Sequence, residues 1–234
     1  MSEVAYEGRD LEVLMRTPNY YAWIMEIFSA FVTGHVIEYG AGAGTVSERL
    51  IPLAERLTLV EPSANLVDKL LTRFAAYPKV EIIGKTLESH IVGVRANAAD
   101  TVVMINVLEH IQDDQEALSQ LLRILKPGGH LLIFVPALQM LMSKLDILHG
   151  HFRRYHKSDL TAKVASAGAT IKVCRYFDLA GVLPWLILNK WGGSTTFNPR
   201  LIQINDKAVV PISRIIERVP PPFGKNLILV ASRQ

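Results

Sequence analysis

Short apolar runs alternate with longer mixed segments along most of this chain. The runs are bounded by polar residues, glycine or proline, which is typical of buried strands. The segments between them are long enough for helices that cross from one strand to the next. This alternation predicts a parallel sheet with helices on both faces. The expected strands lie at 35–39, 57–61, 79–83, 101–106, 129–135, 170–177 and 226–231.

Polar residues also mark where helices begin and end. Asp113 or Asp114 is expected to cap one helix, and the Lys-Pro-Gly-Gly sequence at 126–129 to end it in a tight turn. Ser158 is expected to cap a later helix. These two helices are expected at 115–125 and 158–167.

Two segments stand outside the alternation. Residues 20–28 are dense in aromatic and aliphatic side chains and predict a buried helix, which we interpret as part of a helical lid over 1–34. Residues 178–224 contain several prolines and no regular strand pattern, and we interpret them as an insertion that caps a substrate pocket. The whole chain, 1–234, is expected to form one domain.

Composition narrows the class of protein. Half of the residues are hydrophobic, which allows a substantial core, and the net charge of +3 is too small and scattered to indicate nucleic-acid binding. Cys174 is the single cysteine, so no internal disulfide forms. The N-terminus lacks a signal-peptide pattern, and the apolar run at 179–188 is too short to cross a membrane. We expect a cytoplasmic protein without a membrane span.

Three glycines follow the first expected strand, in Glu38-Tyr-Gly-Ala-Gly-Ala-Gly-Thr45. Alternate glycines let the backbone turn sharply and approach a ligand closely. The dinucleotide fingerprint requires Gly or Ala where Thr45 stands, and the Gly-Lys-Ser/Thr of a P-loop is absent. Glu61 ends the second strand, about 20 residues on, where a carboxylate can accept ribose hydroxyls.

The order of these motifs resembles that of class I S-adenosylmethionine (SAM) dependent methyltransferases. It comprises Glu38-x-Gly-x-Gly-x-Gly, Glu61, Asn-Val-Leu-Glu-His-Ile at 106–111 and Leu-Lys-Pro-Gly-Gly at 125–129. The resemblance implies a three-layer, Rossmann-like α/β fold, with a mostly parallel seven-stranded sheet and an antiparallel last strand. It implies that SAM is bound by Tyr21, Glu38, Gly40, Gly42, Gly44, Glu61, Pro62, Thr86, Leu87, Asn106 and Val107. For adenine the chain departs from the family, because Lys85-Thr86 stands where an aspartate is common, and Thr86, Leu87 or Glu88 would take its place.

A second resemblance is narrower. Gly-His-Phe-Arg-Arg-Tyr at 150–155 and Pro-Pro-Pro-Phe-Gly at 220–224 are similar to a subgroup of bacterial methyltransferases often found beside glycosyltransferases. This implies a sugar, lipid or secondary-metabolite acceptor. The residues that would contact it are Tyr20, His110, Arg153, Arg154 and Tyr155, although a structural network that holds the loop is an alternative role for the last three.

We therefore expect an enzyme that moves the methyl group of SAM to an oxygen, or less readily a nitrogen, of a small-molecule acceptor. His151 is the expected base or orienting group, and His110 is the second choice. No metal site is expected. Trp185 and Trp191 are assigned to the core, a homodimer surface or a peripheral lipid contact. A non-catalytic SAM-binding scaffold and a protein or RNA methyltransferase remain alternatives.

Overall fold

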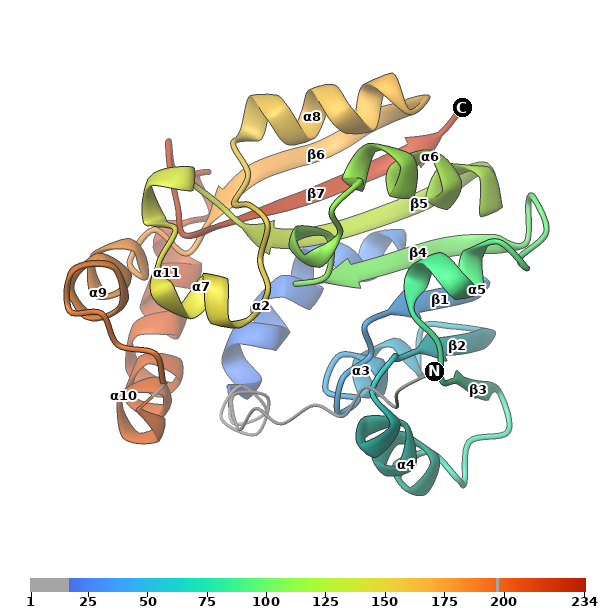
Figure 1. Ribbon diagram of the computed structural model, residues 1–234, viewed down its shortest axis with the longest axis horizontal. Helices are drawn as coiled ribbons and strands as arrows, with labels where there is room; N and C mark the ends of the chain where they lie inside the picture. The colour runs from blue at the N-terminus through green and yellow to red at the C-terminus, as the bar shows by residue number, and fades with distance from the viewer. Residues whose placement is uncertain (1–16, 197) are drawn as a thin grey trace.

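The structure is a computed structural model that describes residues 17–196 and 198–234. Its strands are β1 (His35–Tyr39), β2 (Arg56–Val60), β3 (Val80–Ile83), β4 (Ala99–Ile105), β5 (Leu125–Pro136), β6 (Ala169–Phe177) and β7 (Asn226–Arg233). They form one sheet in the order β3-β2-β1-β4-β5-β7-β6 (Figure 1). β1 to β5 pair in parallel, and β7 runs antiparallel between β5 and β6. The predicted sheet, with its antiparallel last strand, is confirmed.

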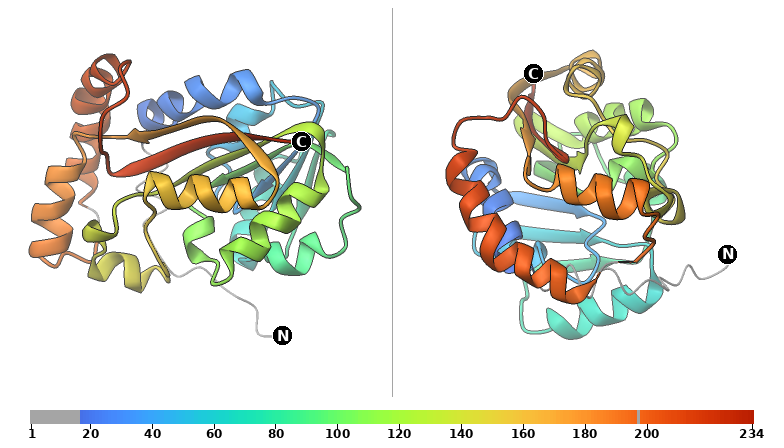
Figure 2. Two further views of the ribbon diagram at one scale, coloured as in Figure 1. Left: turned by 90° about the horizontal axis from the view of Figure 1, so that it is seen from above. Right: turned by 90° about the vertical axis from the view of Figure 1, so that its left-hand side faces the viewer.

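Helices cover both faces of this sheet (Figure 2). Alternate side chains of β5 enter two separate cores, because successive residues of a strand point to opposite faces. Leu131 and Ile133 pack in one core, and Leu132 and Phe134 in the other. The α-helices are α2 (Pro18–Phe28), α3 (Ser47–Leu50), α4 (Ala64–Arg73), α5 (Leu87–Ile91), α6 (Asp114–Ile124), α7 (Lys144–Leu148), α8 (Lys157–Ser166), α9 (Val182–Trp185), α10 (Pro199–Ile204) and α11 (Val210–Ile216).

The predicted end of α6 is wrong in one respect. The helix ends at Ile124, and β5 begins at Leu125, so residues 126–129 lie within the bounds of that strand. The ladder with β4 is irregular here, because Leu125 pairs with Ala99 and His130 pairs with Thr101, and residues 126–129 lie between these two pairs. A Cβ on Gly129 would lie 2.9 Å from the carbonyl oxygen of Asp100, so the glycine allows the close approach of the two strands.

The predicted caps are right for one helix and wrong for the other. Asp113 caps α6, with its side chain accepting a hydrogen bond from the amide of Glu116. Ser158 does not cap α8, because the helix begins at Lys157 and its N-cap residue is His156. The Ser158 hydroxyl contacts Asp159 instead.

Helix α2 corresponds to the aromatic segment expected at 20–28. Trp23 is 2% exposed, and its ring centroid lies 3.8 Å from that of Phe177 on the sheet. The hydroxyl of Tyr20 donates to Asp178 and accepts a hydrogen bond from Asn226. This face of α2 is therefore part of the core. The role of α2 as a lid stays a prediction, and residues 1–16 of the expected lid lie outside the described residues.

The described residues of 178–224 fold mainly as helices beyond the carboxyl ends of the parallel strands (Figure 2). Besides α9, α10 and α11 it contains the π-helical segments η4 (Leu186–Trp191) and η5 (Asn205–Val209). Glu217, near its end, accepts hydrogen bonds from the amides of Asp178 and Leu179 at its beginning. In the described part of the chain, no helix has both the length and the apolar character to cross a membrane.

The burial of Trp23 generates a prediction about stability. Trp23→Ala should lower the free energy of unfolding by about 3–5 kcal/mol, because it leaves a cavity against Phe177. Denaturant unfolding measures the change. Trp191→Ala is the matched control, since Trp191 is 73% exposed and its loss should cost at most about 0.5 kcal/mol. Equal losses in the two variants would contradict the assignment of Trp23 to the core.

Candidate functional site

The glycine loop follows β1 at the carboxyl edge of the sheet. Gly40, Gly42 and Gly44 have φ angles of 71°, 55° and 83°, which favour glycine. A Cβ on Gly40 would lie 2.3 Å from Cγ2 of Val107, which follows β4. The loop therefore passes so close to the end of β4 that a larger side chain would block the approach.

Glu61 ties the end of β2 to this loop. Its Oε2 accepts the amide of Gly42 at 2.9 Å, and its Oε1 accepts the amide of Ser63 at 3.0 Å. Glu61 is 5% exposed, and Pro62 beside it is exposed. Because each carboxylate oxygen has a second lone pair, Glu61 retains the capacity to accept the hydroxyls of a ribose.

Glu38 lies at the base of the loop. Burial raises its pKa to about 8, although the hydroxyl of Ser47 donates to it at 2.6 Å and opposes that rise. Tyr21 of α2 lies close enough to Glu38 for the charge of that carboxylate to affect it. The guanidinium of Arg49 lies 5.9 Å from the centre of the Tyr21 ring. The structure thus brings Tyr21, Glu38 and the glycine loop to one edge of the sheet.

The other expected cofactor residues follow β3 and β4. Asn106 has a φ of 54°, which is uncommon outside glycine and recurs at functional sites. The backbone N–H of Asn106 donates to the carbonyl of Phe134 at 2.8 Å, which holds the backbone in place. Thr86 caps α5 by accepting the amide of Ser89, and Leu87 is buried at the start of that helix. Together with the glycine loop and Glu61, these residues fit an extended nucleoside cofactor such as SAM.

A surface groove of about 610 Å³ lies between α5 and α6. It includes Leu87 and Ile111 but no residue of the glycine loop and none of the clustered histidines described below. We therefore do not assign the groove to the cofactor or the acceptor.

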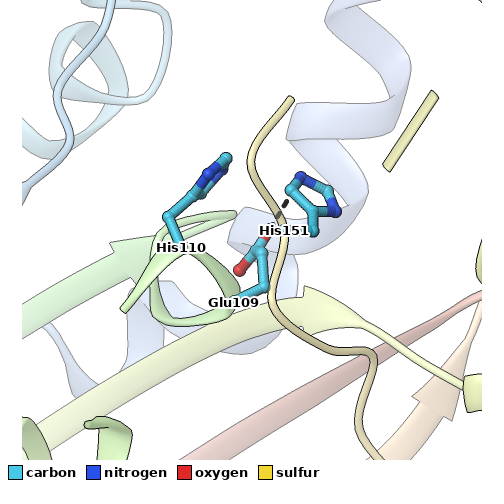
Figure 3. A group of neighbouring side chains, drawn as sticks. All are labelled: Glu109, His110 and His151. Atoms are coloured by element: carbon cyan, nitrogen blue, oxygen red, sulfur yellow. Dashed lines mark ion pairs between the residues drawn. The ribbon is translucent and has the colours of Figure 1, made fainter. Parts of the chain in front are cut away.

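The segment after α7 crosses the short 3₁₀ helix η2 (Leu108–His110) that follows β4. The amide of Phe152 donates to the carbonyl of Glu109 at 2.9 Å. This contact brings His151 beside His110, with their ring centroids 4.6 Å apart and nearly perpendicular (Figure 3). The two histidines predicted from separate motifs therefore form one cluster.

Asp146 of α7 orients His151. Its carboxylate lies 3.0 Å from Nδ1 of His151 and 2.8 Å from the guanidinium of Arg154, and it accepts the hydroxyl of Ser143 at 2.7 Å. Burial alone would raise the pKa of Asp146, but these donors outweigh it and hold the pKa far below its usual range. An ionised carboxylate only accepts hydrogen bonds, so Nδ1 of His151 is the donor in this contact, and Nε2 is the nitrogen left for another partner.

Glu109 is buried beside the two histidines. Among residues 17–196 and 198–234, neither of its carboxylate oxygens has a hydrogen-bond partner, and Oε1 lies 4.0 Å from Nε2 of His151. Burial raises the pKa of Glu109 to about 8. Burial lowers the pKa of His110, and the neighbouring rings of His151 and His149 lower it further. The ring of His110 is therefore neutral near pH 7.

Arg153, Arg154 and Tyr155 follow His151 in the sequence and were expected to bind the acceptor. Their polar side-chain atoms make hydrogen bonds and ion pairs with other residues of the chain. Arg154 pairs with Asp146, and the Tyr155 hydroxyl donates to Asp114. Arg153 pairs with Asp114 and donates to two backbone carbonyls after η2. These contacts match the alternative of a network that holds the loop and do not support direct acceptor binding. Tyr20, engaged in the core, is not among the clustered residues.

Glu109 and Asp146, which lie beside the two histidines, had no role in the sequence-based prediction. Glu109 stands inside the motif at 106–111, but nothing in the sequence shows that its side chain is buried without a partner. Asp146 follows Ser143 in a Ser-x-x-Asp pattern, and the structure forms the capping box that this pattern favours. That pattern could have located α7, though not its contact with His151.

Comparison with known proteins gives a consistent family match. A family model described as a methyltransferase domain matches residues 13–172. A ubiquinone biosynthesis O-methyltransferase from Coxiella burnetii is 29% identical over 97 residues, which cover 42% of this chain and 41% of that protein. A probable SAM-dependent methyltransferase from Mycolicibacterium smegmatis is 26% identical over 139 residues, covering 58% and 52%. The chain thus matches about half or less of the length of these curated relatives.

Solved structures share the fold at low identity. A putative methyltransferase from Bacillus halodurans has a TM-score of 0.65 and 14% identity, with 91% of this chain and 98% of that chain covered. An N-methyltransferase from Haemonchus contortus, solved with phosphomonomethylethanolamine and S-adenosylhomocysteine, has a TM-score of 0.64 and 14% identity, with coverage of 96% and 57%.

The network beside the cluster generates a prediction about pH. Asp114 is buried and pairs with Lys163 and Arg153, and these contacts lower its pKa against the opposing effect of burial. Asp114→Asn should therefore cost about 3 kcal/mol of stability near pH 7, because it leaves cations without their partner. A depressed pKa adds stability above the unfolded value of about 3.9, and that stability is lost as the pH falls below it.

Urea unfolding of both proteins at neutral and acid pH measures this difference. The gap between wild type and Asp114→Asn should narrow as the pH falls through about 4. Asp159→Asn is the control, because Asp159 is exposed on α8 and lies outside the network. A gap that stays constant with pH would show that the charge of Asp114 is not what stabilises the loop.

Proposed function

The chain belongs to the methyltransferase-domain family, and from this premise we propose that it transfers the methyl group of SAM to an oxygen of a small-molecule acceptor. One observation carries the proposal. The ring of His151 lies beside His110, which follows β4 at the carboxyl edge of the sheet, while Asp146 holds Nδ1 of His151.

The cofactor supplies, when bound, a methyl group attached to a positively charged sulfur. The glycine loop and Glu38 hold its amino-acid end, and Glu61 holds its ribose. The backbone of Asn106 and the segment at Thr86–Leu87 complete the cradle. The positive φ angles of the loop, the bond from Gly42 to Glu61 and the strained backbone of Asn106 support this assignment.

His151 acts on the acceptor. Its Nε2 would accept the proton of the acceptor hydroxyl, and the ionised Asp146 would stabilise the imidazolium that results. The bound cofactor would supply the methyl group to the acceptor oxygen and leave as S-adenosylhomocysteine. His110 contacts the acceptor from the other side of the cluster. Arg154, which pairs with Asp146, is a positioning residue, as is Arg153, which anchors the same loop to the chain after η2.

An oxygen acceptor fits this arrangement better than a nitrogen acceptor. A hydroxyl group must lose its proton to become a good nucleophile, so an oriented imidazole contributes directly. A neutral amine already has a free electron pair. The Coxiella burnetii relative, named as an O-methyltransferase, supports the same choice, although the Haemonchus contortus structure shows that the fold also serves nitrogen acceptors.

The acceptor that we propose is hydrophobic or lipid-linked. The helices of 178–224 expose many large apolar side chains, whereas the ring of Trp185 lies under the guanidinium of Arg154. An apolar surface of this kind favours contact with a hydrophobic molecule or a lipid surface. The Gly-His-Phe-Arg-Arg-Tyr motif is consistent with the subgroup that sequence resemblance indicated. The exposed side chains include Leu183, Ile187, Trp191, Ile204, Ile212, Ile215, Ile216 and Val219.

The role of His151 is tested by His151→Ala. In buffer that contains EDTA, the variant should bind SAM with unchanged affinity in calorimetry, because His151 lies outside the cofactor cradle. Formation of S-adenosylhomocysteine with a panel of alkyl-substituted catechols and of sugars should fall by about 100-fold or more, since the base is lost.

His156→Ala is the matched control, because His156 is an exposed histidine outside the cluster and its loss should leave turnover unchanged. Equal turnover in wild type and His151→Ala would remove His151 from the mechanism. Tight SAM binding by the wild type, with no methyl transfer to any member of the panel, would favour the non-catalytic scaffold instead.

The lipid contact is tested by sedimentation with vesicles of phosphatidylcholine and phosphatidylglycerol. The wild type should sediment with them, and a double variant, Ile187→Ala with Trp191→Ala, should bind several-fold more weakly because it loses exposed apolar surface. Leu71→Ala is the control, since Leu71 is 52% exposed on α4, outside 178–224. Loss of binding in the control, or no binding by the wild type, would argue against this surface.

A further inference from the structure

Three potential ligand side chains converge from two distant segments of the chain. Glu109 and His110 lie on η2, and His151 lies in the segment after α7 (Figure 3). One donor atom from each, a carboxylate oxygen or a ring nitrogen, lies within 4.8 Å of the others. The short spacing between these donors comes from the contact of Phe152 with Glu109, not from a sequence motif.

The carboxylate of Glu109 is the group in this cluster that favours binding of a cation. Glu109 is fully buried, and both of its oxygens lack a hydrogen-bond partner in the described structure. A buried carboxylate without a partner costs several kcal/mol unless it meets a cation or a proton. Its Oε1 lies 4.0 Å from Nε2 of His151, so the unpartnered group is directed toward the histidines.

We propose that Glu109, His110 and His151 bind one divalent cation, and that Zn²⁺ is the ion the donors fit best. Two imidazoles and one carboxylate are borderline ligands that suit Zn²⁺ better than Mg²⁺, which prefers oxygen alone. Three protein ligands also leave a fourth position open, as in catalytic zinc sites.

Asp146 provides independent support for this site. A metal-binding histidine usually donates its other ring N–H to a carboxylate, which fixes the tautomer and directs the lone pair at the metal. Nδ1 of His151 makes this contact with Asp146 at 3.0 Å, so Nε2 is the nitrogen that ligates. Arg154 and Ser143 in turn hold Asp146 in place.

Binding requires a small closure of the cluster. Zinc bonds of about 2.0–2.1 Å in a tetrahedral site place neighbouring ligand atoms about 3.3 Å apart. The 4.0 Å contact between Glu109 and His151 must therefore shorten by somewhat less than an ångström. His110 is an exposed side chain on a single 3₁₀ turn, and rotation about its side-chain bonds brings its ring nitrogen closer without any change in the sheet.

The site rests on these contacts and not on the proposed methyl transfer. A cation and a proton compete for Nε2 of His151, so the metal-loaded protein presents a Lewis acid to the acceptor where the metal-free protein presents a base. This proposal departs from the expectation of no metal site, which was made from local spacing and did not combine His151 with Glu109 and His110 from a distant segment.

The test is direct titration of the full chain after treatment with a chelator. Calorimetry with ZnCl₂ should show one equivalent bound, and Co²⁺ should produce the visible absorption of a tetrahedral site, whereas MgCl₂ should bind far more weakly. Glu109→Gln, His110→Ala and His151→Ala should each weaken Zn²⁺ binding by at least about 10-fold, with His156→Ala unchanged. Unaltered SAM affinity and thermal unfolding show that each variant is folded.

Two outcomes would overturn the proposal. Absence of stoichiometric Zn²⁺ binding by the wild type would show that Glu109 is simply a protonated, buried acid. Undiminished binding by Glu109→Gln would show a two-histidine surface contact rather than the three-ligand site. Both readouts are independent of methyl transfer, so failure of the enzyme assay leaves the metal result interpretable.

Discussion

Parallel pairing of β1 with β2 and β4 is the constraint on which the site depends. Parallel strands end at the same edge of a sheet, so residues far apart in sequence meet there. The glycine loop after β1, Glu61 after β2 and Asn106 after β4 meet in this way. The close approach of Gly40 to Val107 then leaves the loop little freedom, which keeps the two strand ends in a fixed relation.

The segment that carries His151 depends on a different kind of contact. Asp146 is a buried carboxylate that joins Arg154, Ser143 and His151 at once. Because a buried charge must keep its partners, these four side chains hold the segment after α7 to α7 itself. Phe152 and Arg153 hold the same segment to η2 and to the chain that follows it. The site thus combines a cradle made by backbone geometry with a loop held by charge.

Much of the fold was predictable from sequence because its signals are local. The apolar run at 35–39 forms β1 without adjustment, and Asp113 caps α6 as expected. Ser158 was misassigned because a cap depends on the local backbone dihedral angles and not on residue type alone. The pairing of Asp146 with His151 and the isolation of Glu109 were beyond prediction, since both arise only when distant segments pack.

The position of β7 has a consequence for how the chain folds. This strand follows all the others in sequence, yet it lies between β5 and β6 and pairs with both. Until residues 226–233 have emerged from the ribosome, β5 and β6 each keep an open edge, and open edges invite pairing with other chains. During synthesis there is therefore a stage at which β1, β2 and β4 can pair with one another while β5 and β6 still lack the strand that joins them.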